Sequence, residues 1–96
     1  MNQMKSVGIH YVGPINDGFS YSLMTCLLAY RTVNIENFVL YLSSTGGSLA
    51  SSYAAYSYLK SAPFRVITVN TGTIESAAVY LYLAGDERYY LPESRF

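Results

Sequence analysis

Charged residues, histidine and cysteine are all scarce in this sequence of 96 residues, and tryptophan is absent. Charged residues make up 12% of the chain, against a usual share of ~25%, and the net charge is zero. The six basic residues are scattered, which excludes the basic patch typical of proteins that bind nucleic acid or an anionic membrane. The single cysteine, Cys26, excludes a disulfide or a cysteine metal cluster within these residues, and its apolar helical surroundings predict a buried, inert thiol.

Long apolar stretches are missing as well. The longest, residues 77–84, is too short to span a bilayer. Residues 1–5 contain nothing like the apolar core of a signal peptide. We therefore expect a cytoplasmic protein that does not cross a membrane.

Apolar residues make up 51% of the sequence, enough for the core of one small domain, which we expect to cover residues 1–96. Eleven tyrosines accompany the few charges. This combination suggests that much of the surface is covered, either by an oligomer interface or by a further part of the polypeptide. An ordinary tyrosine-rich surface is the alternative.

Apolar patterns and turn residues predict seven elements in the order β-α-β-α-β-α-β, an α/β fold with a mainly parallel sheet and right-handed crossovers. The strands are expected at 7–12, 38–42, 64–69 and 88–91, and the helices at 20–31, 49–59 and 75–84. The continuous apolar run 38–42 predicts a strand that is buried on both faces.

Helix ends and helix faces give further expectations. Asp17 or Ser20 is placed to cap the first helix, and Gly85 to end the third. The third helix is apolar all round, so it is expected to be buried on nearly every side. The apolar stripe of the second helix is expected to consist of Leu49, Tyr53, Tyr56 and Leu59.

Two segments follow the carboxyl ends of predicted strands, where parallel sheets bind their ligands. Gly46 and Gly47 allow the backbone to approach a ligand closely, and the N–H groups at the following helix start are unpaired. Ser76 follows the next strand, at the start of a buried helix. A serine hydroxyl beside such N–H groups is the minimum needed to attack an acyl carbon and hold the oxyanion.

Simpler interpretations exist for both segments. The two glycines can form only a tight turn with Ser48 as the helix cap, and Ser76 can cap the third helix. A phosphate cradle is disfavoured because the turn lacks a Lys-Ser/Thr ending and a three-glycine pattern. We expect neither a cofactor nor a metal ion.

A general base is hard to find in the sequence. The only histidine, His10, lies within the first strand, where a structural role is expected. Lys60 belongs to the far end of the second helix. Glu75 precedes Ser76 and suits a helix N-terminus, and it is expected to point away from the serine, since its charge would repel an oxyanion.

Four segments in order resemble the proteolytic subunit of the ATP-dependent Clp protease, and more widely the Clp/crotonase fold. Residues 39–48 (VLYLSSTGGS) are similar to the family's apolar strand followed by Asn-Ser-Pro-Gly-Gly-Ser. Residues 72–78 (GTIESAA) stand where the family has Gly-x-Ala-Ser-Met-Gly-Ala. Residues 83–85 and 90–95 are similar to its Ala-Ala-Gly and Leu-Pro-Asn-Ser-Arg segments. The resemblance covers the front part of the family's subunit.

The resemblance implies a serine endopeptidase with Ser76 as the nucleophile and the backbone N–H groups of Gly47 and Ala77 as the oxyanion hole. It also implies a peptide or unfolded protein as substrate, a homo-oligomer, and an ATP-dependent unfoldase as a partner. The chain departs from the pattern at Thr45, where the family has proline, and at Glu75. The family's histidine and acidic residue correspond to positions beyond Phe96, so we expect the 96-residue chain alone to be inactive.

Two other functions remain open at this stage. One is a non-catalytic, structural Clp-like subunit, which the residues at positions 45 and 75 favour. The other is a crotonase-like acyl-thioester enzyme, which uses an oxyanion hole without a serine. The serine at position 76 favours the peptidase over the thioester enzyme.

Overall fold

The computed structural model describes residues 5–96, and its elements follow the predicted order. Residues 1–4, which belong to the segment used to argue against a signal peptide, lie outside the described residues. The strands are β1 (Ser6–Val12), β2 (Asn37–Ser44), β3 (Arg65–Ile74) and β4 (Glu87–Tyr90), and the helices are α1 (Asp17–Tyr30), α2 (Leu49–Lys60) and α3 (Ala78–Leu83).

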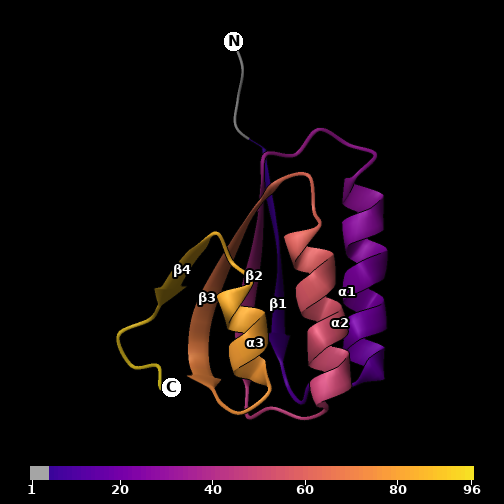
Figure 1. The fold of residues 1–96 in the computed structure, drawn as a ribbon. Coiled ribbons are helices and arrows are strands. Elements are labelled where there is room, and N and C mark those ends of the chain that lie inside the picture. The colour runs from indigo at the N-terminus through magenta and orange to yellow at the C-terminus, as the bar shows by residue number, and fades with distance from the viewer. Residues whose placement is uncertain (1–4) are drawn as a thin grey trace.

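The four strands form one parallel sheet in the order β1-β2-β3-β4, so each strand lies beside its neighbour in the sequence. Because right-handed crossovers between such strands all pass on the same side, the helices cover one face only. Figure 1 shows α1 and α2 side by side on this face, with α3 next to α2. The α/β fold with a parallel sheet is therefore confirmed.

The core lies between the sheet and the helices. Phe38, Leu40 and Leu42 of β2 are fully buried there, together with Leu23 of α1 and Leu81 of α3. Alternate residues of the central strands, among them Val39 and Tyr41, point to the face without helices and are half-buried. The expectation that 38–42 is buried on both faces is thus wrong, since no helix crosses to the second face.

Two predictions about helix ends are also wrong. Asn16, rather than Asp17 or Ser20, caps α1, because its extended backbone lets its side chain accept a hydrogen bond from the N–H of Phe19. Gly85 does not adopt a left-handed conformation. It is instead required for close packing, because an added Cβ would meet the Thr68 hydroxyl and backbone.

The buried faces of α2 and α3 are narrower than predicted. In α2 the buried residues are Ser51, Ser52, Ala55 and Leu59, while Leu49 and Tyr53 are exposed. In α3 the outward residues Val79, Tyr80 and Leu83 are exposed. Small residues on α2 allow close approach to its neighbours, so the tyrosines are displaced to the rim.

Candidate functional site

The glycine turn after β2 is held against the segment that follows β1. The N–H of Ile15 donates to the carbonyl of Gly46, and the N–H of Ser48 donates to the carbonyl of Ile15, each at 2.9 Å. In such a parallel bridge the residue between the bonded groups directs its own N–H to the opposite side. The N–H of Gly47 therefore faces away from Ile15, toward the end of β3.

Both glycines of this turn are required by the backbone. Gly46 has φ 110° and Gly47 has φ 151°, values that other residues rarely adopt. A Cβ added at Gly47 would also collide with the Ile15 carbonyl. Steric constraints and hydrogen bonds therefore both hold the turn against Ile15.

Ser76 has a strained backbone. Its φ of 55° makes it the only residue other than glycine with positive φ among residues 5–96. Such strain is typical of functional sites, and a nucleophile on a sharp strand-to-helix turn is one known form of it. The side chain is exposed, and its hydroxyl has no hydrogen-bond partner among the described residues.

A capping role for Ser76 is excluded by this geometry. The helix α3 begins only at Ala78, its cap position is Ala77, and no side chain caps it. The hydroxyl of Ser76 is thus left without the structural task that was the simplest alternative for it.

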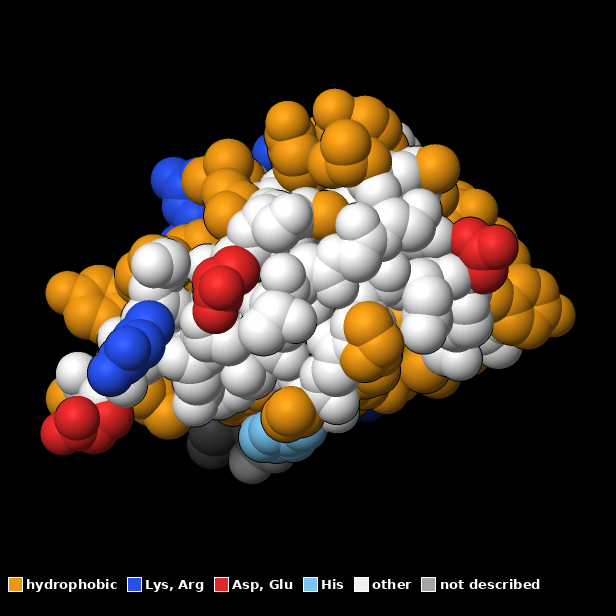
Figure 2. Space-filling view, turned by 90° about the horizontal axis from the view of Figure 1, so that it is seen from below, with side chains coloured by type: hydrophobic (Ala, Val, Ile, Leu, Met, Phe, Trp, Pro, Cys, Tyr) orange, Lys and Arg blue, Asp and Glu red, His pale blue; other side chains and the backbone are white. Residues whose placement is uncertain are grey.

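The glycine turn and Ser76 lie against each other. A Cβ added at Gly46 would lie 2.8 Å from the Cβ of Ser76, 3.1 Å from the carbonyl oxygen of Glu75 and 3.2 Å from the nitrogen of Ala77. The expectation that the two segments meet at one edge of the sheet is confirmed. Figure 2 looks onto this edge, where backbone and uncharged polar groups occupy the centre and charged side chains are few.

Two backbone N–H groups lie at this contact, one on the exposed Gly47 and one on the buried Ala77. Within residues 5–96 neither the N–H of Gly47 nor that of Ala77 donates to a protein acceptor. One belongs to the glycine turn and the other directly follows Ser76. Two donors beside an exposed hydroxyl are the arrangement that stabilises the oxyanion of an acyl transfer.

Glu75 is held away from the serine. Its carboxylate accepts a 2.6 Å hydrogen bond from the hydroxyl of Thr73, and its N–H donates to the carbonyl of Ser44 at 3.1 Å. The second bond fixes the chain just before Ser76 to the end of β2. The carboxylate is thereby fixed on the Thr73 side.

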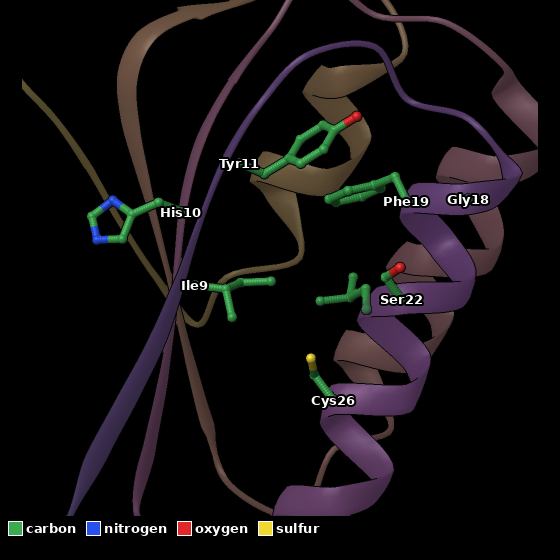
Figure 3. Close-up of a pocket in the computed structure, with 8 residues that line it drawn as sticks. Ile9, His10, Tyr11, Gly18, Phe19, Ser22 and Cys26 are labelled. Atoms are coloured by element: carbon green, nitrogen blue, oxygen red, sulfur yellow. The ribbon is translucent and has the colours of Figure 1, made fainter.

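No base accompanies Ser76 among the described residues. His10 is exposed and stacks on Tyr41 at 4.2 Å between ring centroids, on the face without helices. Figure 3 shows its ring pointing away from α1, whereas Ile9 and Tyr11 point toward that helix. Lys60 ends α2 at the opposite end from the glycine turn.

The remaining features do not suggest a metal or a membrane segment. In the part of the chain that the structure describes, no group of His, Cys, Asp and Glu side chains could hold a metal ion. None of the helices there is long and apolar enough to cross a membrane. Cys26 is only half-buried and lines a hollow between β1 and α1 (Figure 3), so the expectation of a buried thiol is wrong.

Two residues that support the site were not identified from the sequence. Asn70 is fully buried, its amide donates to the carbonyl of Arg95 at 2.6 Å, and its side-chain oxygen accepts from the N–H of Gly72. It holds the C-terminal segment against an irregular part of β3, where the register with β2 shifts. The sequence signal for Asn70 was its polar side chain directly after the apolar strand residues 64–69. The second supporting residue is Ser52 of α2, whose hydroxyl donates a hydrogen bond to the carbonyl oxygen of Ala77.

The profile of the Clp protease family matches residues 1–96, the whole chain. The chain belongs to the Clp protease family. It is 30% identical over 97 residues to the ATP-dependent Clp protease proteolytic subunit 3 of Rhizobium etli, covering 99% of the chain and 50% of that relative. It is 33% identical over 84 residues to proteolytic subunit 2 of Prochlorococcus marinus strain MIT 9312, covering 84% of the chain and 41% of the relative.

The fold agrees with this family. ClpP1 from Listeria monocytogenes superposes with a TM-score of 0.86 at 24% sequence identity, covering 91% of this chain and 52% of that one. The chain spans about half the length of the relatives that it matches.

Proposed function

We propose that this chain carries the nucleophile and oxyanion hole of a Clp-type serine endopeptidase. The observation behind the proposal is the contact of the strained, exposed Ser76 with a glycine turn, beside two N–H groups that have no protein acceptor. Ser76 Oγ attacks the carbonyl carbon of a peptide bond. The N–H groups of Gly47 and Ala77 stabilise the oxyanion, and the amine leaves as the acyl-enzyme forms.

The hydroxyl proton must be accepted by a base, and no base lies beside Ser76 within residues 5–96. In this proposal a group outside these residues supplies it, either from a longer polypeptide or from another chain. The 96-residue chain alone is then expected to hydrolyse substrate no faster than a serine peptidase that has lost one residue of its Ser-His-Asp catalytic triad.

The relatives' names support the choice of substrate and partners. They are proteolytic subunits of an ATP-dependent protease. We propose a peptide or unfolded protein as substrate, assembly into a homo-oligomer, cooperation with an ATP-dependent unfoldase, and a cytoplasmic location.

A non-catalytic Clp-like subunit is the second candidate. The missing base favours it, as does Glu75, whose charge directly precedes the nucleophile. In such a subunit the glycine turn and α3 would have only a structural role.

Reaction of the purified chain with a fluorophosphonate, followed by peptide mass spectrometry, separates these candidates. The peptidase proposal predicts slow phosphonylation that occurs at Ser76 and is lost in Ser76→Ala. Ser57→Ala, which changes an exposed serine of α2, is the matched control and should react normally. A folded chain that does not react, or that reacts equally after Ser76→Ala, would support the non-catalytic subunit.

A further inference from the structure

A second feature of the site edge is a hollow of about 220 Å³ beside the glycine turn. We call it the Thr45 hollow. It is lined by Val12, Gly13, Pro14, Ser43, Ser44, Thr45 and Thr73. Four of these residues carry hydroxyl groups, and all seven lie near the carboxyl ends of β1, β2 and β3.

A carboxylate is fixed next to this hollow. Thr73, which lines it, donates its hydroxyl hydrogen to Glu75 Oε2 at 2.6 Å. The side chain of Glu75 is exposed. Among residues 5–96 the only ion pair is Arg65–Glu87, so no basic side chain neutralises the carboxylate of Glu75. Arg95 forms no ion pair with it either, although the backbone of Arg95 pairs with that of Thr73. A negative charge with a fixed position and no partner favours a cation.

The hollow and the carboxylate are adjacent to the reacting groups. Thr45 directly precedes Gly46, and Glu75 directly precedes Ser76. A peptide whose carbonyl carbon lies at Ser76 Oγ therefore places a neighbouring side chain close to both.

The size of the hollow indicates what can enter it. Pockets that hold a drug-sized ligand or a cofactor usually measure about 300–1,000 Å³. The Thr45 hollow lies below this range and suits a single side chain. The hydroxyls of Ser43 and Ser44 already accept hydrogen bonds from the N–H groups of Thr73 and Gly46. The hydroxyl oxygens of Thr45 and Thr73 can accept hydrogen bonds from an ammonium or guanidinium group.

We infer that the Thr45 hollow and Glu75 form a subsite for a cationic side chain, lysine or arginine, within one residue of the scissile bond. The inference rests on the proposed function and adds a substrate class to it. It also gives a role to Glu75, where the resembling family has a small residue. The positive side chain of the substrate supplies the ionic partner that this carboxylate lacks among residues 5–96.

The test compares peptide diphenyl phosphonates, which react with a serine nucleophile by displacement of phenoxide. Matched pairs carry either lysine or norleucine, at the residue attached to phosphorus or at the preceding one. In at least one pair, the lysine probe is expected to phosphonylate Ser76 up to about fivefold faster, the upper end of the range for an exposed ion pair. The preference should shrink at high salt.

Two variants identify the carboxylate responsible. Glu75→Gln is expected to abolish the preference for lysine. Glu93→Gln removes an equal charge from an exposed residue of the C-terminal segment and should retain the preference. Equal rates for lysine and norleucine at both positions, with Ser76 reactive, would overturn the subsite while the peptidase proposal stands.

A binding measurement makes the inference independent of catalysis. The acetylated methylamides of lysine and norleucine are titrated into Ser76→Ala, and the amide NMR signals of Thr45 and Thr73 are followed. The lysine compound alone should shift them, and Glu75→Gln should abolish the shift. NMR shifts without any phosphonylation of Ser76 would overturn the peptidase proposal and leave the subsite. If neither the shifts nor the phosphonylation occurred, the peptidase proposal and the subsite would both be overturned.

Discussion

The hydroxyl of Ser52 in α2 donates a 2.6 Å hydrogen bond to the carbonyl oxygen of Ala77, and both residues are buried. This bond ties the second helix to the turn that contains Ser76. The same carbonyl also accepts from the N–H of Tyr80 at 3.2 Å, so it has two donors.

Replacement of Ser52 by alanine is expected to destabilise the protein by about 1 kcal/mol, because one donor to Ala77 remains. Reaction of Ser76 with a fluorophosphonate should also slow, although most of the chain stays folded, because the turn loses its anchor on α2. Urea unfolding and labelling rates measure the two effects. Ser57→Ala is the control, and an unchanged labelling rate in Ser52→Ala would show that the bond does not position Ser76.

Replacement of Gly46 by alanine is expected to abolish reaction at Ser76. The new Cβ would lie 2.8 Å from that of Ser76, and the backbone at φ 110° disfavours a side chain. A destabilisation of about 1–3 kcal/mol should accompany the change.

Gly18→Ala is the matched control for this substitution. A Cβ added there, inside α1, would meet only the side-chain oxygen of Asn16 at 3.4 Å. Removal of a helical glycine should leave stability equal or higher by up to about 1 kcal/mol. Normal reactivity of Gly46→Ala would contradict the contact between the glycine turn and the nucleophile.

The attachment of β4 is expected to weaken in acid. The hydrogen bonds from Tyr89 and Arg65 hold the pKa of the Glu87 carboxyl below its ordinary value. A lowered pKa in the folded state gives stability that is complete above the pKa of the unfolded chain. That stability is lost as the pH falls through the lower folded value.

Urea unfolding between neutral pH and pH 3 measures this dependence. Glu87→Gln should be less stable than the parent at neutral pH, and the difference should shrink in acid. Glu93→Gln alters an exposed glutamate of the C-terminal segment, and its stability should change between the two pH values by the same amount as that of the parent. A difference that does not depend on pH would exclude ionisation of Glu87 as the cause.

Self-association at micromolar concentration is expected from the apolar groups on α3 and β4. Tyr80, Tyr89 and Tyr90 are exposed, and so is Leu83. Tyr82 does not contribute to this surface, because it is buried and its hydroxyl donates to the carbonyl of Tyr89. Association would bury apolar surface, and each Å² removed from water stabilises the oligomer by about 25 cal/mol.

Sedimentation velocity at several concentrations tests the association. Leu83→Glu should favour the monomer, because it places a charge in the contact. Val33→Glu introduces the same charge at an exposed residue of the loop between α1 and β2, and it is expected to have little effect. A stable monomer at all concentrations would show that these groups need no cover.

The sequence alone determined the order of elements, the parallel sheet and the two segments of the site. These features depend on local chemistry. Alternating and continuous apolar runs indicated the strands, and glycine with small residues after 38–42 indicated a turn at the carboxyl edge. Because parallel strands end at the same edge, Gly46 and Ser76 could be expected to meet without knowledge of their contacts.

Only the tertiary structure decided which side of each element is covered and how the site is held. Three crossovers of the same hand leave one face of the sheet without helices, which a strand's own residues cannot reveal. The left-handed backbone of Ser76 results from constraint by its neighbours, since a serine has no preference for it. The bonds from Asn70 to Arg95 and from Ser52 to Ala77 join residues 25 positions apart, so no local pattern could specify them.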